Sequence, residues 1–167
     1  MIEPLSSLIP RFTPRWLTAS VWMLIVLATL LLASPAGSKA KERTFGQALV
    51  EKTVAKHPEL SGLGLATNTR EGRMCVTIAD TDATEIGEKC DQDDLAVIRT
   101  DKATIEQDRD GYDVTLPLHV SGKTIGIISM DFRLGQPQAS VLNTATAIAE
   151  EIEHQIPSET RLFERAD

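Results

Sequence analysis

The chain has 167 residues, a formal net charge of −7 and an aromatic content of only 4%. This length accommodates one ordinary domain and leaves little for a second. The acidic balance argues against binding to nucleic acid or to anionic lipid, and the low aromatic content removes the stacking platforms of single-strand binders, so we expect no nucleic-acid partner.

Residues 1–40 have the pattern of a membrane-targeting segment. Arg11 and Arg15 precede an uncharged run, residues 16–33, that is apolar in nearly every position, and small residues follow it. These features predict a cleaved signal peptide. The alternative is an uncleaved N-terminal membrane anchor, because the run also reaches the roughly 17–25 residues that span a bilayer. In either case we expect the remainder to be exported, to the periplasm or the extracellular space.

The exported part is expected to begin with a helix over residues 43–56, because apolar residues recur there in helical register and Pro58 follows. Two short strands are predicted next, over residues 60–68 and 72–80, with a hairpin turn between them. A strongly acidic loop follows the second strand and leads into a short helix within residues 91–100.

The clearest β pattern covers residues 102–134, where we expect about three strands. Glycine and lysine after Ser121 predict a tight turn between two antiparallel strands. Pro117 cannot donate a backbone hydrogen bond, so it predicts a sheet edge or a bulge. One face of this region is expected to be buried, because apolar and polar residues alternate through Tyr112, Val114, Leu116 and Leu118.

The last predicted element is an amphipathic helix that ends before Pro157, and residues 158–167 are expected to form a polar C-terminal tail. Together these elements predict a single α+β domain over residues 41–157, with one central antiparallel sheet flanked by N- and C-terminal helices. The apolar face of the last helix is predicted from the three-to-four spacing of Val141, Ala145, Ile148, Ile152 and Ile156.

Cys75 and Cys90 are the only cysteines of the chain. An exported protein meets an oxidising compartment, so we expect them to form a disulfide, which would stabilise the fold by about 3 kcal/mol. Two unpaired buried thiols remain the alternative. A catalytic pair is disfavoured because the spacing is not that of a Cys-x-x-Cys motif.

The acidic loop suggests a calcium site, since oxygen-bearing side chains from Asp80 onward fall in an EF-hand register. However, Glu85 occupies the position that needs a turn glycine, and Asp91 replaces the usual bidentate glutamate. The scattered cysteines and histidines lack zinc spacing, and no nucleophile elbow or phosphate loop occurs. We therefore expect no metal, no cofactor and no enzymatic activity.

Two stretches resemble a known family. Residues 76–95, "VTIADTDATEIGEKCDQDDL", are similar to the strand, turn and loop of extracytoplasmic Cache domains, which are PAS-like sensor modules of bacterial receptors. Residues 111–132, "GYDVTLPLHVSGKTIGIISMDF", resemble the glycine hairpin that Cache domains share with PAS and GAF sensors. With the flanking helices, the resemblance covers about residues 44–157.

The resemblance implies a pocket on one face of the sheet, roofed by residues 79–99, that binds a small organic ligand such as a carboxylate or an amino acid. Arg99 would pair with a carboxylate, whereas Asp80 or Asp131 would favour an amine. The candidate ligand contacts implied in this way are Asp80, Thr81, Arg99, Tyr112 and Asp131.

Cache modules generally lie between two transmembrane helices and pass a signal to an output domain. We find one apolar run and no output domain in this sequence, so we expect a partner protein or a homodimer to take up the signal, or the protein simply to carry its ligand. Two alternatives stay open. One is a protein–protein interaction module with a self-filled pocket, and the other is a thiol-redox sensor that uses Cys75 and Cys90.

Overall fold

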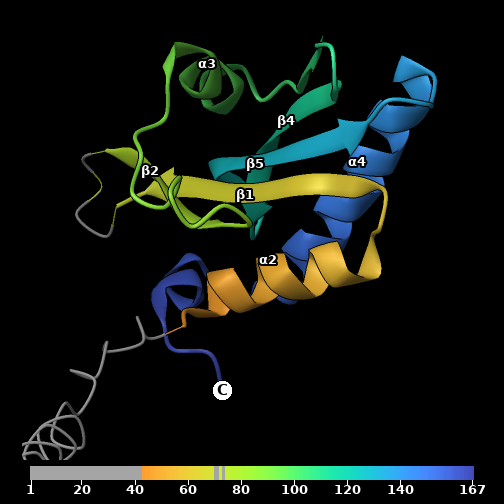
Figure 1. Cartoon of the computed structure of the whole chain (residues 1–167). Helices are drawn as coiled ribbons and strands as arrows, with labels where there is room; N and C mark the ends of the chain where they lie inside the picture. The colour runs from red at the N-terminus through yellow and green to blue at the C-terminus, as the bar shows by residue number, and fades with distance from the viewer. Residues whose placement is uncertain (1–42, 70–71, 73) are drawn as a thin grey trace, which may run out of the picture. The chain divides into compact units, whose positions relative to one another are not determined.

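The computed structural model describes residues 43–69, 72 and 74–167, so the predicted targeting segment lies outside the described residues. No helix in these ranges is long and apolar enough to cross a membrane. The elements are α2 (Phe45–Lys56), β1 (Leu60–Asn68), β2 (Cys75–Asp80), α3 (Gln92–Thr100), β3 (Thr104–Gln107), β4 (Gly111–Val120), β5 (Lys123–Arg133), α4 (Gln138–Gln155) and the short 3₁₀ helix η1 (Glu159–Phe163) (Figure 1).

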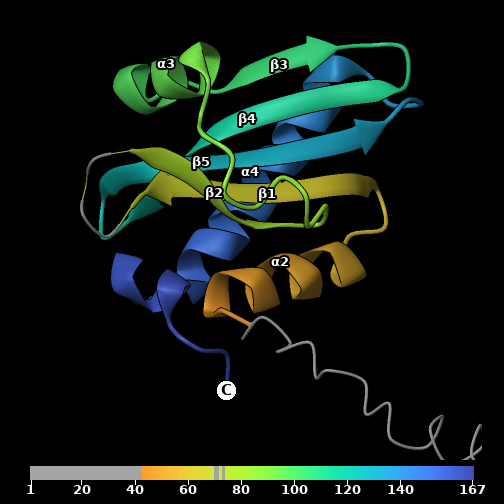
Figure 2. The ribbon, with the colours of Figure 1, turned by 60° about the vertical axis from the view of Figure 1, so that its left-hand side comes forward.

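The five strands form one sheet in the order β2-β1-β5-β4-β3, and every neighbouring pair is antiparallel. Helices α2 and α4 cover one face of the sheet, and α3 covers the other (Figures 1 and 2). The predicted α+β class with a central antiparallel sheet is thus confirmed. The hairpin turn predicted between β1 and β2 falls partly on residues outside the described ranges.

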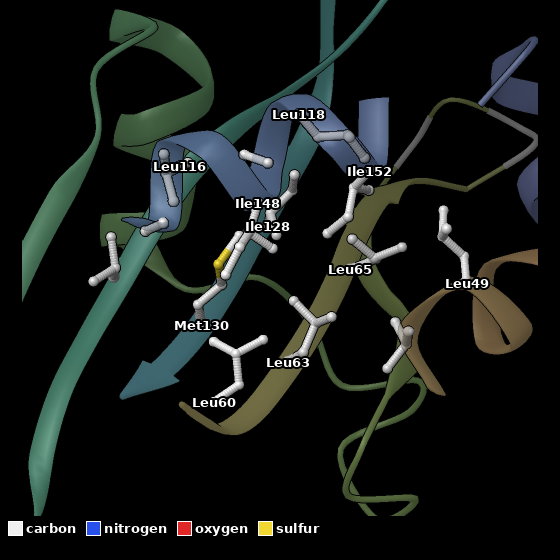
Figure 3. Packing of buried hydrophobic residues seen from close by; sticks show 14 of the residues in the cluster. Leu49, Leu60, Leu63, Leu65, Leu116, Leu118, Ile128, Met130, Ile148 and Ile152 are labelled. Carbon is white, nitrogen blue, oxygen red and sulfur yellow. The ribbon is translucent and has the colours of Figure 1, made fainter. Parts of the chain in front are cut away.

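The main core lies between the sheet and the pair α2 and α4. The alternating residues of β4 point into it, and so does the predicted apolar stripe of α4, whose Val141, Ala145 and Ile152 have no exposed surface. Side chains from β1, β5 and α4 meet in Figure 3, where Leu63, Ile128 and Ile148 lie close together. The predicted alternation of β4 and the predicted periodicity of the last helix are therefore confirmed.

Pro117 stands where the sequence predicts an edge or a bulge. Strand β3 pairs with β4 only from Tyr112 to Thr115, so β4 has no partner on that side at Pro117. The β4–β5 register also shifts directly afterwards, between Leu118 and His119. The missing amide hydrogen therefore costs the sheet no ladder bond on the β3 side.

The prediction of a polar tail after Pro157 is wrong for part of the segment. Leu162 in η1 is fully buried in the main core, and η1 packs against α2. The Phe45 amide donates to the carbonyl of Glu164 at 2.7 Å, and the Arg161 guanidinium lies 4.9 Å from the centre of the Phe45 ring. Leu162 and Phe163 stand among polar residues, and two adjacent apolar residues are too few to show a periodicity, so the sequence pattern did not reveal that they pack on the core.

Candidate functional site

The face of the sheet below α3 carries unusually small side chains. Strand β1 contributes Gly62, Gly64 and Ala66 to this face, and β5 contributes Ser129 next to β1. Because these residues fill little space, a cavity of about 290 Å³ remains between the sheet, the loop after β2 and the start of α3. The residues that line this α3 cavity are Gly64, Leu65, Ala66, Thr77, Asp80, Glu85, Glu88, Lys89, Asp91, Asp94, Ile127 and Ser129.

A β-bulge in β2 aims Asp80 at this cavity. Ala66 pairs with Thr77 while Leu65 pairs with Ala79, so Ile78 is an extra residue in the ladder. The side chains of Thr77 and Asp80 therefore reach the same face although they are three positions apart, which unbroken alternation would forbid. Bulges re-aim side chains in this way next to functional sites.

Two aspartates lean over the glycines of β1. A Cβ atom at Gly64 would collide with Oδ2 of Asp80, and one at Gly62 would collide with Oδ2 of Asp131. Larger residues at these two positions would push both carboxylates away from the sheet. The glycines therefore bring carboxylates of β2 and β5 towards each other across the strand between them.

Desolvation shapes the charge state of the carboxylates inside the α3 cavity. Burial is the largest cause that raises the pKa of Asp80 above its ordinary value, and it outweighs the hydrogen bonds from Asp82 and Thr81. The pKa of Asp94 is raised for the same first reason, with a further contribution from the negative charge of Asp91. Both groups are half-buried. A positive ligand would relieve this penalty, because an opposite charge stabilises the ionised form.

Two further carboxylates lie beside the cavity on the same face. The pKa of Asp131 is raised, first by desolvation and then by the charges of Asp80 and Asp108. The pKa of Asp113 is raised as well, first by desolvation and then by Asp131. Negative charge thus accumulates over the centre of this sheet face and not only in the loop.

The roof of the cavity is a structured loop. The chain after β2 returns along that strand, since the Thr77 amide donates to the Glu88 carbonyl at 2.9 Å and the Gly87 amide donates to the Thr77 carbonyl at 2.8 Å. Asp91 begins α3 as its N-cap and accepts from the Asp94 amide at 2.9 Å, in a capping box. Part of the acidic character of the loop therefore serves the helix terminus.

The predicted disulfide between Cys75 and Cys90 is present, with the two Cα atoms 5.4 Å apart. It joins the start of β2 to the residue before the N-cap of α3. Val97 of α3 and Ile127 of β5 pack with it in a small second core. The bond therefore holds the N-terminal end of α3 against the sheet.

The residues singled out from the sequence are distributed over several places. Asp80 lines the α3 cavity, whereas Asp131 and Tyr112 line a second cavity of about 200 Å³ nearby. Thr81 accepts from the Leu63 amide at 3.2 Å through its hydroxyl. Arg99 is exposed on α3 and lines neither of these two cavities. A ligand contact by any of them stays a prediction.

Sequence reasoning missed Asp94, Glu88 and Ser129 among the lining residues. Ser129 alternates with buried Ile128 and Met130, which is the one local signal that could have placed it on the opposite face. The described part of the chain contains no group of three or more histidine, cysteine or acidic residues arranged to hold a metal ion.

No protein-family model matches the chain, and no curated protein matches its sequence. Solved structures do match. A GAF domain/HD domain protein from Geobacter sulfurreducens aligns over 72% of this chain and 96% of its own, with a TM-score of 0.54 and 16% identity. The second GAF domain of DevS from Mycobacterium smegmatis aligns over 65% and 88%, with a TM-score of 0.52 and 14% identity. A methyl-accepting chemotaxis protein, residues 122 to 287, aligns over 65% and 84%, with a TM-score of 0.51 and 12% identity.

These similarities show that the chain has a fold of the GAF and PAS-like type. At such low identity they describe the fold alone. The narrower resemblance to Cache domains stays a prediction.

Proposed function

We propose that this protein is an exported, sensor-like domain that binds a small positively charged organic molecule, such as an amine, in the α3 cavity and does not transform it. The observation that carries the proposal is the charge of the lining. One ammonium group, that of Lys89, faces five carboxylates, those of Asp80, Glu85, Glu88, Asp91 and Asp94.

The charge of the lining favours an amine over the carboxylate and amino-acid ligands that the sequence resemblance implies. A carboxylate would meet like charge, and Arg99, the residue expected to pair with it, is not among the lining residues. An ammonium group would instead find charge-assisted acceptors in Asp80 and Asp94, both of them half-buried. The cavity volume of about 290 Å³ suits a small ligand, since drug-sized pockets begin at about 300 Å³.

The role as a sensor is supported by the fold class and by the sequence. The structures with a similar fold include a GAF domain and part of a methyl-accepting chemotaxis protein. The basic and apolar pattern of residues 1–40 supports export, and the disulfide suits an oxidising compartment. The signal would pass to a partner protein or through a homodimer.

The proposal is tested by thermal unfolding of the full chain, expressed with its own N-terminal segment under oxidising conditions. Primary and quaternary amines are compared with neutral isosteres, carboxylates and amino acids. A ligand at 100 times its dissociation constant adds about 2.7 kcal/mol, which raises the melting temperature by about 5 °C or more. We expect such a shift from amines alone.

Asp80→Asn is the decisive variant. The backbone amide of Asp82 donates a hydrogen bond to Oδ1 of Asp80 at 2.7 Å, and the side-chain oxygen of asparagine can still accept this bond while the negative charge is lost. We expect it to remove the amine shift. Asp93→Asn is the matched control, since it removes one charge from the exposed side of α3 without touching the cavity lining. A shift from carboxylates would refute the ligand class, and no shift from any compound would favour the interaction module.

A further inference from the structure

One imidazole connects both faces of the sheet at the end of β4. His119 Nδ1 lies 2.9 Å from Oε1 of Glu153 on α4, and its Nε2 lies 2.8 Å from Oδ1 of Asp101. Asp101 is the C-cap of α3. Because α3 and α4 lie on opposite faces of the sheet (Figure 1), His119 ties the two helices to the β4–β5 hairpin. The α3 cavity does not include this residue.

Each ring nitrogen of His119 lies beside a carboxylate oxygen, so each needs its own hydrogen to donate, and a neutral histidine has only one. A neutral imidazole has one N–H donor, so its other nitrogen would present a lone pair to a carboxylate. Only the imidazolium donates to Glu153 and Asp101 together. Burial by itself lowers the pKa of His119, but the hydrogen bonds and negative charges of Asp101 and Glu153 outweigh burial and raise the pKa above its ordinary value.

Loss of the proton should break the contact to Asp101 rather than the contact to Glu153. Glu153 Oε1 accepts from the backbone amide of His119 at 2.6 Å as well as from the ring, which holds it beside Nδ1. Asp101 has an exposed side chain and an alternative donor, the Thr124 hydroxyl at 2.7 Å. The neutral ring therefore keeps its hydrogen on Nδ1, and its Nε2 lone pair repels Asp101.

We propose that His119 is a pH-sensitive latch: its protonated ring strengthens the attachment of the C-terminal end of α3 to the β4–β5 hairpin, and its neutral ring weakens it, leaving the Thr124 hydroxyl as the remaining donor to Asp101. The disulfide at Cys90 keeps the other end of α3 in place at any pH. The charged groups that act on the imidazole are Asp101 from α3 and Glu153 from α4, and β5 contributes the neutral Thr124. Since α3 carries Asp94 in the cavity lining, the latch would also regulate ligand affinity, a consequence that rests on the proposed function.

The direction of the pH effect follows from the raised pKa of His119. Its pKa in the folded state lies above the unfolded value of 6.5. While Asp101 and Glu153 are ionised, the latch therefore contributes fully below pH 6.5, and its contribution is lost as the pH rises through the folded pKa of His119. Mild acid therefore strengthens the attachment of the C-terminal end of α3 to the sheet, and alkali weakens this attachment.

Amide hydrogen exchange on the full chain tests the latch without any ligand. Rates are corrected for intrinsic base catalysis, and α2 serves as the internal reference. We expect the protection of the last turn of α3, relative to α2, to fall by about three- to tenfold as the pH rises, the size set by a partly exposed charged hydrogen bond. The midpoint should equal that of the His119 ring in an NMR titration.

His119→Gln should remove the pH step and leave α3 at its low, alkaline protection. His154→Gln is the matched control, because it changes an exposed histidine of α4 and should leave the step intact. A step that survives His119→Gln, or one whose midpoint differs from the His119 titration in the unmodified protein, overturns the latch. The NMR comparison decides the matter even if the variant does not fold. A confirmed step without any amine-induced thermal shift would refute the proposed ligand and leave the latch standing.

Discussion

Single glycines decide how closely carboxylates approach the sheet, and two glycines of the same sheet serve different purposes. Gly64 faces the side chain of Asp80, whose carboxylate can turn away from an added methyl group. Gly126 faces the backbone carbonyl of Ala66 on the neighbouring strand, which cannot move without the strand itself. Gly64 therefore serves the site, because it leaves room for a side chain, whereas Gly126 serves the fold, because it leaves room for backbone.

We expect Gly64→Ala to leave stability nearly unchanged and to weaken amine binding, because it displaces Asp80. Gly126→Ala should lower the free energy of unfolding by about 1–3 kcal/mol or more, as overpacking does in a filled interior. Urea unfolding of both variants, with the amine panel on Gly64→Ala, checks this pair. Equal destabilisation by the two changes would contradict the assignment.

At the scale of elements, the clearest departure from expectation is the C-terminal segment. Hydrophobic periodicity identifies α4 because the helix repeats its apolar positions over 18 residues. The 3₁₀ helix η1 has five residues and one fully buried side chain, so no period can be measured. Such a short element can be recognised only from its packing against the core, which the folded structure shows and the sequence does not.

Leu162→Ala should lower the free energy of unfolding by about 2–5 kcal/mol, because it empties a fully buried site between η1 and the core. Thr160→Ala, an exposed change in the same 3₁₀ helix, should alter stability by less than about 0.5 kcal/mol. Chemical denaturation of the two variants provides the measurement. If Leu162→Ala unfolds like the control, the segment is the tail that its polar sequence suggests.

For the molecule as a whole, the two faces of the sheet have different tasks. The face under α2 and α4 holds the main core, whereas the face under α3 has a smaller core around Ala66, Cys75, Val97 and Ile127 next to a polar cavity. The disulfide lies within the smaller core and crosslinks the roof to the sheet. A covalent bond suits this layer because few apolar side chains are available to hold it.

Replacing both cysteines by alanine should lower the free energy of unfolding by about 3 kcal/mol in the chain-entropy model for a loop of this size. Hydrogen exchange should localise the added openings to residues 81–100, with α4 as the protected reference. The reduced unmodified protein serves as the matched comparison and should behave alike. Uniform loss of protection over both faces would show that the disulfide supports the whole domain and not the roof.

The sequence by itself determined the α+β class, the buried alternation of β4 and the apolar stripe of α4, and it favoured the pairing of Cys75 with Cys90, which the structure then showed. These features follow from the spacing of apolar residues within single segments, or from the presence of only two cysteines in the chain. Such spacing can be seen without knowing which other segments pack nearby. Only the tertiary structure decided which polar groups meet. Asp80 and Asp131 approach across β1 through a bulge and two glycines, and His119 meets acids from two helices. Contacts between distant segments depend on how strands and helices pack, and a bulge changes which side chains share a face, so the pattern within one segment does not reveal them.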